Sequence, residues 1–125
     1  MENTPDNGNS RKILVVDDER AVRDLVAVVL RRAGHEVETA ASGEETLERL
    51  KTRDYDVIFL DVILQGQLSG FDVFDELERR ELADRVVFLT GRPCDEKQMD
   101  YFRRASAFLT KPVQSLHEIL AAAAL

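Results

Sequence analysis

Five short apolar runs recur along the chain, separated by longer stretches in which apolar and polar residues are mixed. The first, third and fourth runs are continuously apolar, which is typical of strands buried on both faces of a sheet. The second run alternates apolar and charged residues, and this pattern favours the edge of a sheet. The predicted strands are Ile13–Val16, the HEVETA segment at 35–40, Val57–Leu60, Val86–Leu89 and Ala107–Leu109.

The stretches between these runs carry helical signals. In the first, apolar residues recur at i, i+3, i+4 and i+7, one face of a helix, and Gly34 ends that helix. Ser42 with Glu45 forms a capping box for the second helix, and Ser69 caps the third. The fourth and fifth helices each follow a proline. The residues expected to face inward from the first, third, fourth and fifth helices are Val22, Leu25, Val26, Val29 and Ala33; Phe71, Phe74 and Leu77; Met99 and Phe102; and Leu116, Ile119, Leu120 and Ala123.

Strand and helix alternate five times, which predicts an α/β fold with a parallel sheet and helices on both faces. At 125 residues the doubly wound, flavodoxin-like order 2-1-3-4-5 is the expected topology. The length fits a single domain, which we expect to span residues 11–125. Residues 1–10 contain no apolar segment and are expected to form a disordered leader.

The charge of the chain narrows the classes of partner. A net charge of −7 argues against direct binding of nucleic acid and against an anionic membrane surface. The longest apolar runs are too short to span a bilayer, and the first ten residues cannot form a signal peptide. Cys94 is the single cysteine, so an internal disulfide and a thiolate metal cluster are excluded. The cytoplasm is therefore the expected location.

Polar residues follow the predicted strands at their carboxyl ends, where ligands bind in open α/β sheets. Asp17 and Asp18 follow the first run, Asp61 the third, Thr90 the fourth and Lys111 the fifth. In the order 2-1-3-4-5 the first and third strands are neighbours, so the three aspartates should meet. Three clustered carboxylates need a cation, and Mg²⁺ suits carboxylates combined with waters and a phosphate. With a lysine and a hydroxyl beside them, these residues predict a phosphoryl site in which a carboxylate can be the nucleophile.

The motifs ILVVDDE, DVIFLDV, VVFLTG and FLTKP resemble the receiver domain of two-component response regulators, in particular chemotaxis regulators. The resemblance covers residues 11–123. It implies that Asp61 accepts a phosphoryl group from a histidine kinase or a phosphotransfer protein. It also implies a site for Mg²⁺ or Mn²⁺, formed directly by Asp18 and Asp61, by Asp17 through water, and by the backbone carbonyl of Ile63.

The resemblance assigns further roles around this site. Lys111 would contact the phosphoryl oxygens, and its bond to Pro112 would be cis. Thr90 would move toward the phosphoryl group and let Phe108 turn inward, which remodels the face formed by the fourth helix, fifth strand and fifth helix. That face would bind an output domain or partner protein, or support a phosphorylation-dependent homodimer. Ile63 and Arg92 occupy positions where the family varies the rate of dephosphorylation, and the apolar Ile63 suggests a long-lived phosphoryl state.

Four positions depart from the family pattern. Leu64-Gln65 stands where a Met-Pro pair is common, and the loop before Gly70 is one residue longer. Arg104 replaces a frequent glycine, and Val113 replaces a frequent phenylalanine. These departures leave the three acids, Thr90 and Lys111 in place, so they bear on loop shape and partner recognition.

Three other functions compete with a phosphorylation-controlled switch. A degenerate receiver could act only as a protein-docking module, but such a module has no need of clustered acids. A flavin-binding protein would want a Ser-, Thr- or Gly-rich phosphate loop where this chain has DDERAV. A phosphatase of the haloacid dehalogenase type would want D-x-D, which Asp17-Asp18-Glu19 does not supply. The chain is thus expected not to be an enzyme, although it would promote its own phosphotransfer and slow autodephosphorylation.

Overall fold

The computed structural model describes residues 10–91, 95–111 and 116–124. Strands and helices alternate in chain order, and each predicted strand is confirmed to within one residue at either end. A short 3-10 helix, Ala83–Arg85, precedes the fourth strand. The strands are β1 Lys12–Val16, β2 Glu36–Ala40, β3 Val57–Asp61, β4 Val86–Thr90 and β5 Ala107–Thr110, and the helices are α1 Arg20–Arg32, α2 Gly43–Arg49, α3 Gly70–Arg79, α4 Glu96–Arg104 and α5 Leu116–Ala123.

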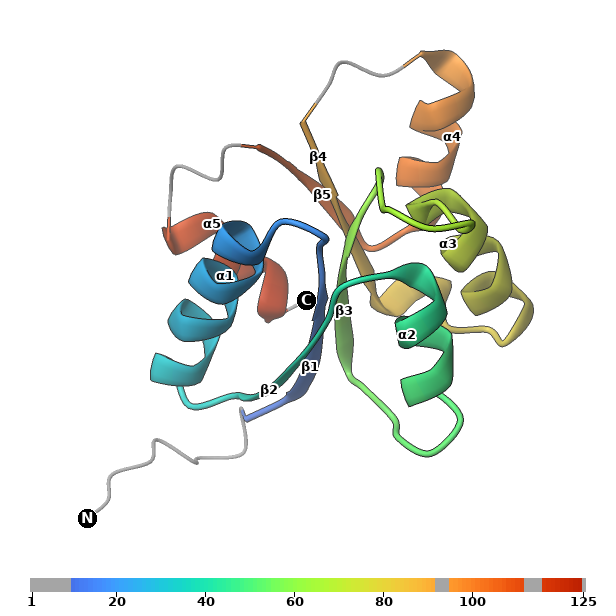
Figure 1. Ribbon diagram of the computed structural model, residues 1–125. Coiled ribbons are helices and arrows are strands. Elements are labelled where there is room, and N and C mark those ends of the chain that lie inside the picture. The colour runs from blue at the N-terminus through green and yellow to red at the C-terminus, as the bar shows by residue number, and fades with distance from the viewer. Residues whose placement is uncertain (1–9, 92–94, 112–115, 125) are drawn as a thin grey trace.

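The five strands form one parallel sheet in the order β2-β1-β3-β4-β5, which confirms the predicted doubly wound topology. As predicted, β2 lies at an edge. Figure 1 shows α1 and α5 on one side of the sheet and α2, α3 and α4 on the other. Because all strands run the same way, their carboxyl ends meet at a single edge, where the chain order reverses between β1 and β3.

The core consists of two apolar layers, one on each side of the sheet. In β1, Ile13 and Val15 face the α1 and α5 layer, whereas Leu14 and Val16 face the opposite layer. All four side chains are fully buried. This two-sided burial explains why β1, β3 and β4 are continuously apolar in sequence.

The predicted inward face of α1 is partly wrong. Val26 is buried as expected, but Leu25 is 48% exposed and Ala33 is exposed, while Ala27 and Leu30 are buried instead. Residues 25–30 are all apolar, so periodicity alone does not determine which of them faces the sheet. The same holds in α5, where Ile119 and Ala123 are buried but Leu120 is 38% exposed.

The helix ends follow the predicted capping signals, with one difference. Gly34 has a φ of 98°, and its N–H donates to the carbonyl of Arg31 beyond the end of α1. Ser69 and Asp72 form a complete capping box on α3. Ser42 accepts from the Glu45 N–H as predicted, but the Glu45 carboxylate accepts from the N–H of Ala41, one residue earlier than a capping box requires.

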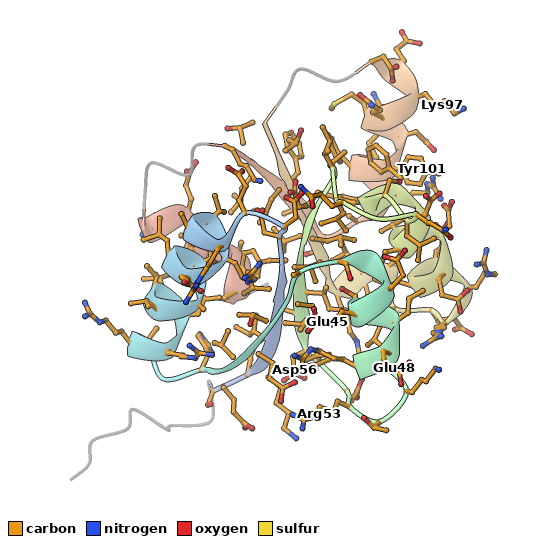
Figure 2. The ribbon with its side chains drawn as sticks, viewed as in Figure 1. Glu45, Glu48, Arg53, Asp56, Lys97 and Tyr101 are labelled. Carbon is orange, nitrogen blue, oxygen red and sulfur yellow. The ribbon has the colours of Figure 1, made fainter. Side chains whose placement is uncertain are left out.

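Arg104 stands where receiver domains often have a glycine, and it links α4 to α3 through side-chain contacts. Its guanidinium pairs with Glu78 on α3 and lies 3.2 Å from the carboxylate of Asp100. The guanidinium carbon also lies 4.7 Å from the ring centroid of Tyr101, itself stacked 4.4 Å from Phe71. In Figure 2, Tyr101 lies where α4 meets α3. This departure therefore adds a polar and aromatic contact between two helices.

Replacing Arg104 with alanine is expected to lower the free energy of unfolding by about 1 kcal/mol, because an ion pair and a cation–π contact are lost. Arg103 is exposed and adjacent, so Arg103→Ala provides a matched control with the same charge change. Urea unfolding of both variants measures the difference. Equal stability of the two variants would show that the Arg104 contacts do not stabilise the domain.

Some predictions lie outside the described residues. These are the leader at 1–9, Arg92, Pro112 and its peptide bond, Val113, and the side chain of Leu116. Within the described ranges, none of the helices has the length and apolar character needed to cross a membrane.

Candidate functional site

Three aspartates meet at the carboxyl edge of the sheet. Asp17 directly follows β1 and Asp61 is the last residue of β3. The register pairs Val16 with Leu60, so the next residue on each strand lies on the same level. One carboxylate oxygen from each of Asp17, Asp18 and Asp61 lies within 4.8 Å of the other two. The predicted acidic cluster therefore exists, and the parallel pairing of β1 with β3 creates it.

The backbone orients two of these carboxylates. Asp17 is fully buried and Asp61 is 4% exposed. Asp17 Oδ1 accepts a hydrogen bond from the N–H of Glu19 at 2.8 Å, and Asp61 Oδ1 accepts one from the N–H of Ile63 at 3.3 Å. Each aspartate keeps its Oδ2 directed toward a shared cation.

That cation is Lys111, which directly follows β5. Its Nζ lies 2.8 Å from Asp17 Oδ2, 3.2 Å from Asp61 Oδ2 and 3.5 Å from Glu19 Oε1. Burial of the ammonium would lower its pKa, but the hydrogen bond to Asp17 and the charge of Asp61 outweigh this effect and raise the pKa of Lys111. Lys111 therefore stays charged and links the two buried carboxylates.

The pKa of Asp61 is strongly raised by its surroundings. Burial, followed by the charge of Asp17, raises the pKa of Asp61 to about 7, although Lys111 and the Ile63 N–H oppose the shift. The ionised form of a carboxylate with such a pKa is stabilised by any further positive charge placed beside it. The site as folded is thus short of cationic charge.

A hard divalent cation would supply the missing positive charge. The oxygens of Asp17, Asp18 and Asp61 supply the donor type that Mg²⁺ prefers, and Asp18 is only partly buried. The raised pKa of Asp61, caused by burial and by the charge of Asp17, is in keeping with this, because an added cation would stabilise the ionised carboxylate. The acids present therefore fit Mg²⁺ or Mn²⁺.

The two switch candidates also lie near this edge. Thr90 ends β4 and is 4% exposed, and its backbone carbonyl accepts from the N–H of Lys111 at 2.7 Å. Phe108 on β5 is 41% exposed and stacks on Phe102 of α4, with ring centroids 4.8 Å apart. The Phe108 side chain thus lies at the surface against α4 in this structure.

Gly70 allows the start of α3 to pack closely against the end of β3. Its N–H donates to the carbonyl of Val62 at 2.8 Å. A Cβ at this position would lie 2.1 Å from the backbone oxygen of Asp61 and 2.9 Å from its carbonyl carbon. Only glycine allows α3 to begin this close to Asp61. The sequence marks Gly70 as the residue before which the loop ends, but the close contact with Asp61 is visible only in the structure.

Arg23 is a further residue at the site that was not predicted from the sequence. Its guanidinium donates to the backbone carbonyl of Asp17 at 2.8 Å, from the first turn of α1. The signal available in the sequence was a positively charged residue, Arg23, shortly after the Asp17-Asp18 pair. The Ile63 side chain, by contrast, is 54% exposed beside the cluster and brings no polar atom to it.

The chain is similar to known proteins over most of its length. The family model for the response regulator receiver domain matches residues 13–124. The chain is 36% identical over 104 residues to the alkaline phosphatase synthesis transcriptional regulatory protein PhoP of Bacillus subtilis (strain 168), covering 82% of this chain and 43% of that protein. It is 36% identical over 103 residues to AfsQ1 of Streptomyces coelicolor, covering 82% of this chain and 45% of that regulator.

Solved structures give the same result. The receiver domain of NtrX from Brucella abortus superimposes with a TM-score of 0.80 at 36% identity, covering 89% of this chain and 93% of that one. CheY4 of Vibrio cholerae gives a TM-score of 0.77 at 28% identity, covering 91% of this chain and 98% of that one. The fold and the acidic cluster thus define a receiver-type α/β domain. The chain belongs to the response regulator receiver family of two-component signalling, and it spans less than half the length of PhoP and AfsQ1.

Proposed function

We propose that this chain is a phosphorylation-controlled switch whose phosphoacceptor is Asp61. The observation that carries the proposal is the cluster of Asp17, Asp18 and Asp61 at the carboxyl edge of the sheet, with the ammonium of Lys111 beside Asp17 and Asp61. Family membership supports the same reading. We further propose that residues 11–125 form the receiver domain.

The chemistry is a phosphoryl transfer to a carboxylate. An oxygen of Asp61 attacks the phosphorus of a phosphohistidine on a kinase or phosphotransfer protein, the P–N bond breaks, and the imidazole nitrogen keeps the electron pair. Lys111, held 3.2 Å from Asp61 Oδ2, neutralises charge on the phosphoryl oxygens. The Thr90 hydroxyl donates to the phosphoryl group once it is in place.

Asp17, Asp18, Asp61 and the backbone carbonyl of Ile63 would hold Mg²⁺ or Mn²⁺. When bound, the cation offsets the charge of the clustered acids and of the incoming phosphoryl group. The chain's own residues do the rest: Glu19 and Ile63 orient two carboxylates through backbone N–H groups, and Lys111 supplies the fixed charge.

We also propose how phosphorylation would change the surface that partners recognise. Movement of Thr90 toward the phosphoryl group would let Phe108 leave its stack on Phe102 and turn inward, changing the face built from α4, β5 and α5. An output domain, a partner protein or a second phosphorylated copy would bind there. PhoP and AfsQ1 are transcriptional regulators, and the regions that match this chain make up 43% and 45% of their lengths, which supports an attached output domain and a cytoplasmic setting.

Amide hydrogen exchange separates a switch from a docking module. The protein is compared with and without acetyl phosphate in the presence of Mg²⁺. A switch predicts changed exchange in β4, α4 and β5, with β2 and the carboxyl half of α1 unchanged as an internal control. Identical exchange in both samples, in protein that has been phosphorylated, would favour the docking module.

The apolar side chain of Ile63 predicts a slow loss of the phosphoryl group, because it cannot hydrogen-bond an attacking water. Replacing Ile63 with asparagine is expected to shorten the phosphoryl half-life about tenfold, which corresponds to about 1.4 kcal/mol of activation free energy. Ile63→Val keeps the apolar character and should retain the long half-life. A short half-life in the unmodified protein, or equal decay in both variants, would overturn this prediction.

A further inference from the structure

The loop between β3 and α3 links the phosphoacceptor to the third helix. It begins directly after Asp61, contains Ile63 and ends at Gly70. This loop is one residue longer than expected for the family and has no proline in it. Gly66, near its middle, has a φ of 103°, a conformation that other residues adopt at a cost. The sequence of the loop thus does little to restrain its own backbone.

The first turn of α2 supplies a restraint from outside the loop. The N–H of Gln67 donates to Glu44 Oε2 at 2.9 Å. The backbone of Gly66 passes so close that a Cβ there would lie 2.9 Å from Glu44 Oε1. Both oxygens of one carboxylate therefore face the middle of the loop.

Glycine at position 43 brings α2 close enough for this contact. A Cβ on Gly43 would lie 2.9 Å from the Cβ of Leu68 in the loop and 2.7 Å from Val73 Cγ2 on α3. Gly43 is buried and Leu68 packs on the core between the two helices. Glu44, the next residue of α2, thus reaches a loop that already packs against Gly43 of the same helix.

We propose that Glu44 is a positioning residue for the phosphoacceptor site, acting through the β3–α3 loop. By accepting from Gln67, Glu44 fixes the middle of the loop whose first residues orient Asp61 and present the Ile63 carbonyl. Loss of that hydrogen bond should loosen the loop, weaken Mg²⁺ binding and slow phosphorylation. The inference rests on the proposed function, because it assigns Glu44 to the same site.

Three variants separate positioning from charge. Glu44→Gln removes the charge but keeps an oxygen that can accept from Gln67, whereas Glu44→Ala removes both. Glu48→Ala removes an exposed acid one turn further along α2, where Glu48 pairs with Lys51. Figure 2 shows Glu48 at the lower end of α2, away from the loop at the upper edge of the sheet. It is therefore a matched control for charge and for helix propensity.

The measurement is a titration with Mg²⁺ alone, monitored through backbone amide chemical shifts. It is carried out at physiological ionic strength, where exposed charges are largely screened. The hydrogen exchange rate of the Gln67 amide is recorded on the same samples. Glu44→Ala is expected to weaken Mg²⁺ affinity about three- to tenfold and to speed exchange at Gln67, because outer residues that orient ligands affect metal affinity strongly. Glu44→Gln and Glu48→Ala should behave like the unmodified protein.

Two results would overturn the inference. Equal weakening by Glu44→Gln and Glu44→Ala would show that charge alone acts, and unchanged affinity in Glu44→Ala would show that the contact does not position the site. Failure of the proposed function looks different, because then the unmodified protein itself would neither bind Mg²⁺ nor accept a phosphoryl group.

Discussion

Replacing Asp61 with asparagine is expected to abolish phosphorylation and, at the same time, to stabilise the metal-free domain at neutral pH. The first effect follows because the nucleophilic carboxylate is lost. The second follows because Asp61 is buried beside Asp17, which raises the pKa of Asp61 to about 7. Asparagine removes this charge and leaves the pair between Lys111 and Asp17, 2.8 Å apart, intact.

The stabilising effect depends on pH. The pKa of Asp61 rises from 3.8 in the unfolded chain to about 7 in the folded one, so the folded state binds the proton more tightly. The associated stability is present at acidic pH and is lost as pH rises through about 7. The advantage of Asp61→Asn should therefore grow between about pH 4 and pH 7 and level off at higher pH. At pH 8 it should reach about 2–4 kcal/mol, or roughly 10 °C in Tm.

Asp56→Asn is the matched control for this prediction. Asp56 is exposed at the opposite end of the sheet, as Figure 2 shows, and its carboxylate accepts from the N–H of Lys12 at 2.9 Å. Thermal unfolding in EDTA across the pH range should show almost no change for this variant. If Asp61→Asn is no more stable than the unmodified protein at pH 8, the acids do not repel one another as the structure implies.

Replacing Gly70 with alanine is expected to destabilise the domain by about 3 kcal/mol and to slow phosphorylation at Asp61 by one to two orders of magnitude. The added Cβ would lie 2.1 Å from the backbone oxygen of Asp61, so either α3 or the end of β3 must move. A shift of that size misplaces the nucleophile relative to Lys111 and the neighbouring acids. Urea unfolding and the rate of adduct formation with acetyl phosphate measure the two effects.

Gly91→Ala tests whether any added methyl group at this edge is harmful. Among the residues that the structure describes, a Cβ on Gly91 would meet only the Cβ of Lys111, at an ordinary 3.9 Å, and the φ of Gly91 lies outside the left-handed region. This variant should stay within about 0.5 kcal/mol of the unmodified protein and keep its phosphorylation rate. Equal behaviour of the two alanine variants would contradict the close approach of α3 to Asp61.

The fold could be predicted from the sequence because its three inner strands are buried on both faces. The continuous apolar runs of β1, β3 and β4 mark strands that lie inside the sheet, and the alternation in β2 marks its edge. Which face of α1 is buried could not be predicted, because residues 25–30 are all apolar and several choices of buried face fit the sequence equally well. Leu25 was therefore expected to be buried and is 48% exposed.

The acidic cluster could also be predicted, because strand order alone brings the residues after β1 and β3 together. What surrounds the cluster could not. Contacts of Gly70 with Asp61 and of Glu44 with Gln67 join segments whose relative placement depends on the path of the loop between β3 and α3. The bond from Arg23 to the Asp17 carbonyl depends likewise on the orientation of one long side chain.

Intact mass spectrometry after incubation with acetyl phosphate and Mg²⁺ tests the central claim most directly. Three samples are compared: the unmodified protein, the same protein in EDTA, and Asp61→Asn. The proposed function predicts the mass of one added phosphoryl group in the first sample and none in the other two. An adduct that persists in Asp61→Asn, or its absence from the unmodified protein with Mg²⁺ present, would contradict Asp61 as the phosphoacceptor.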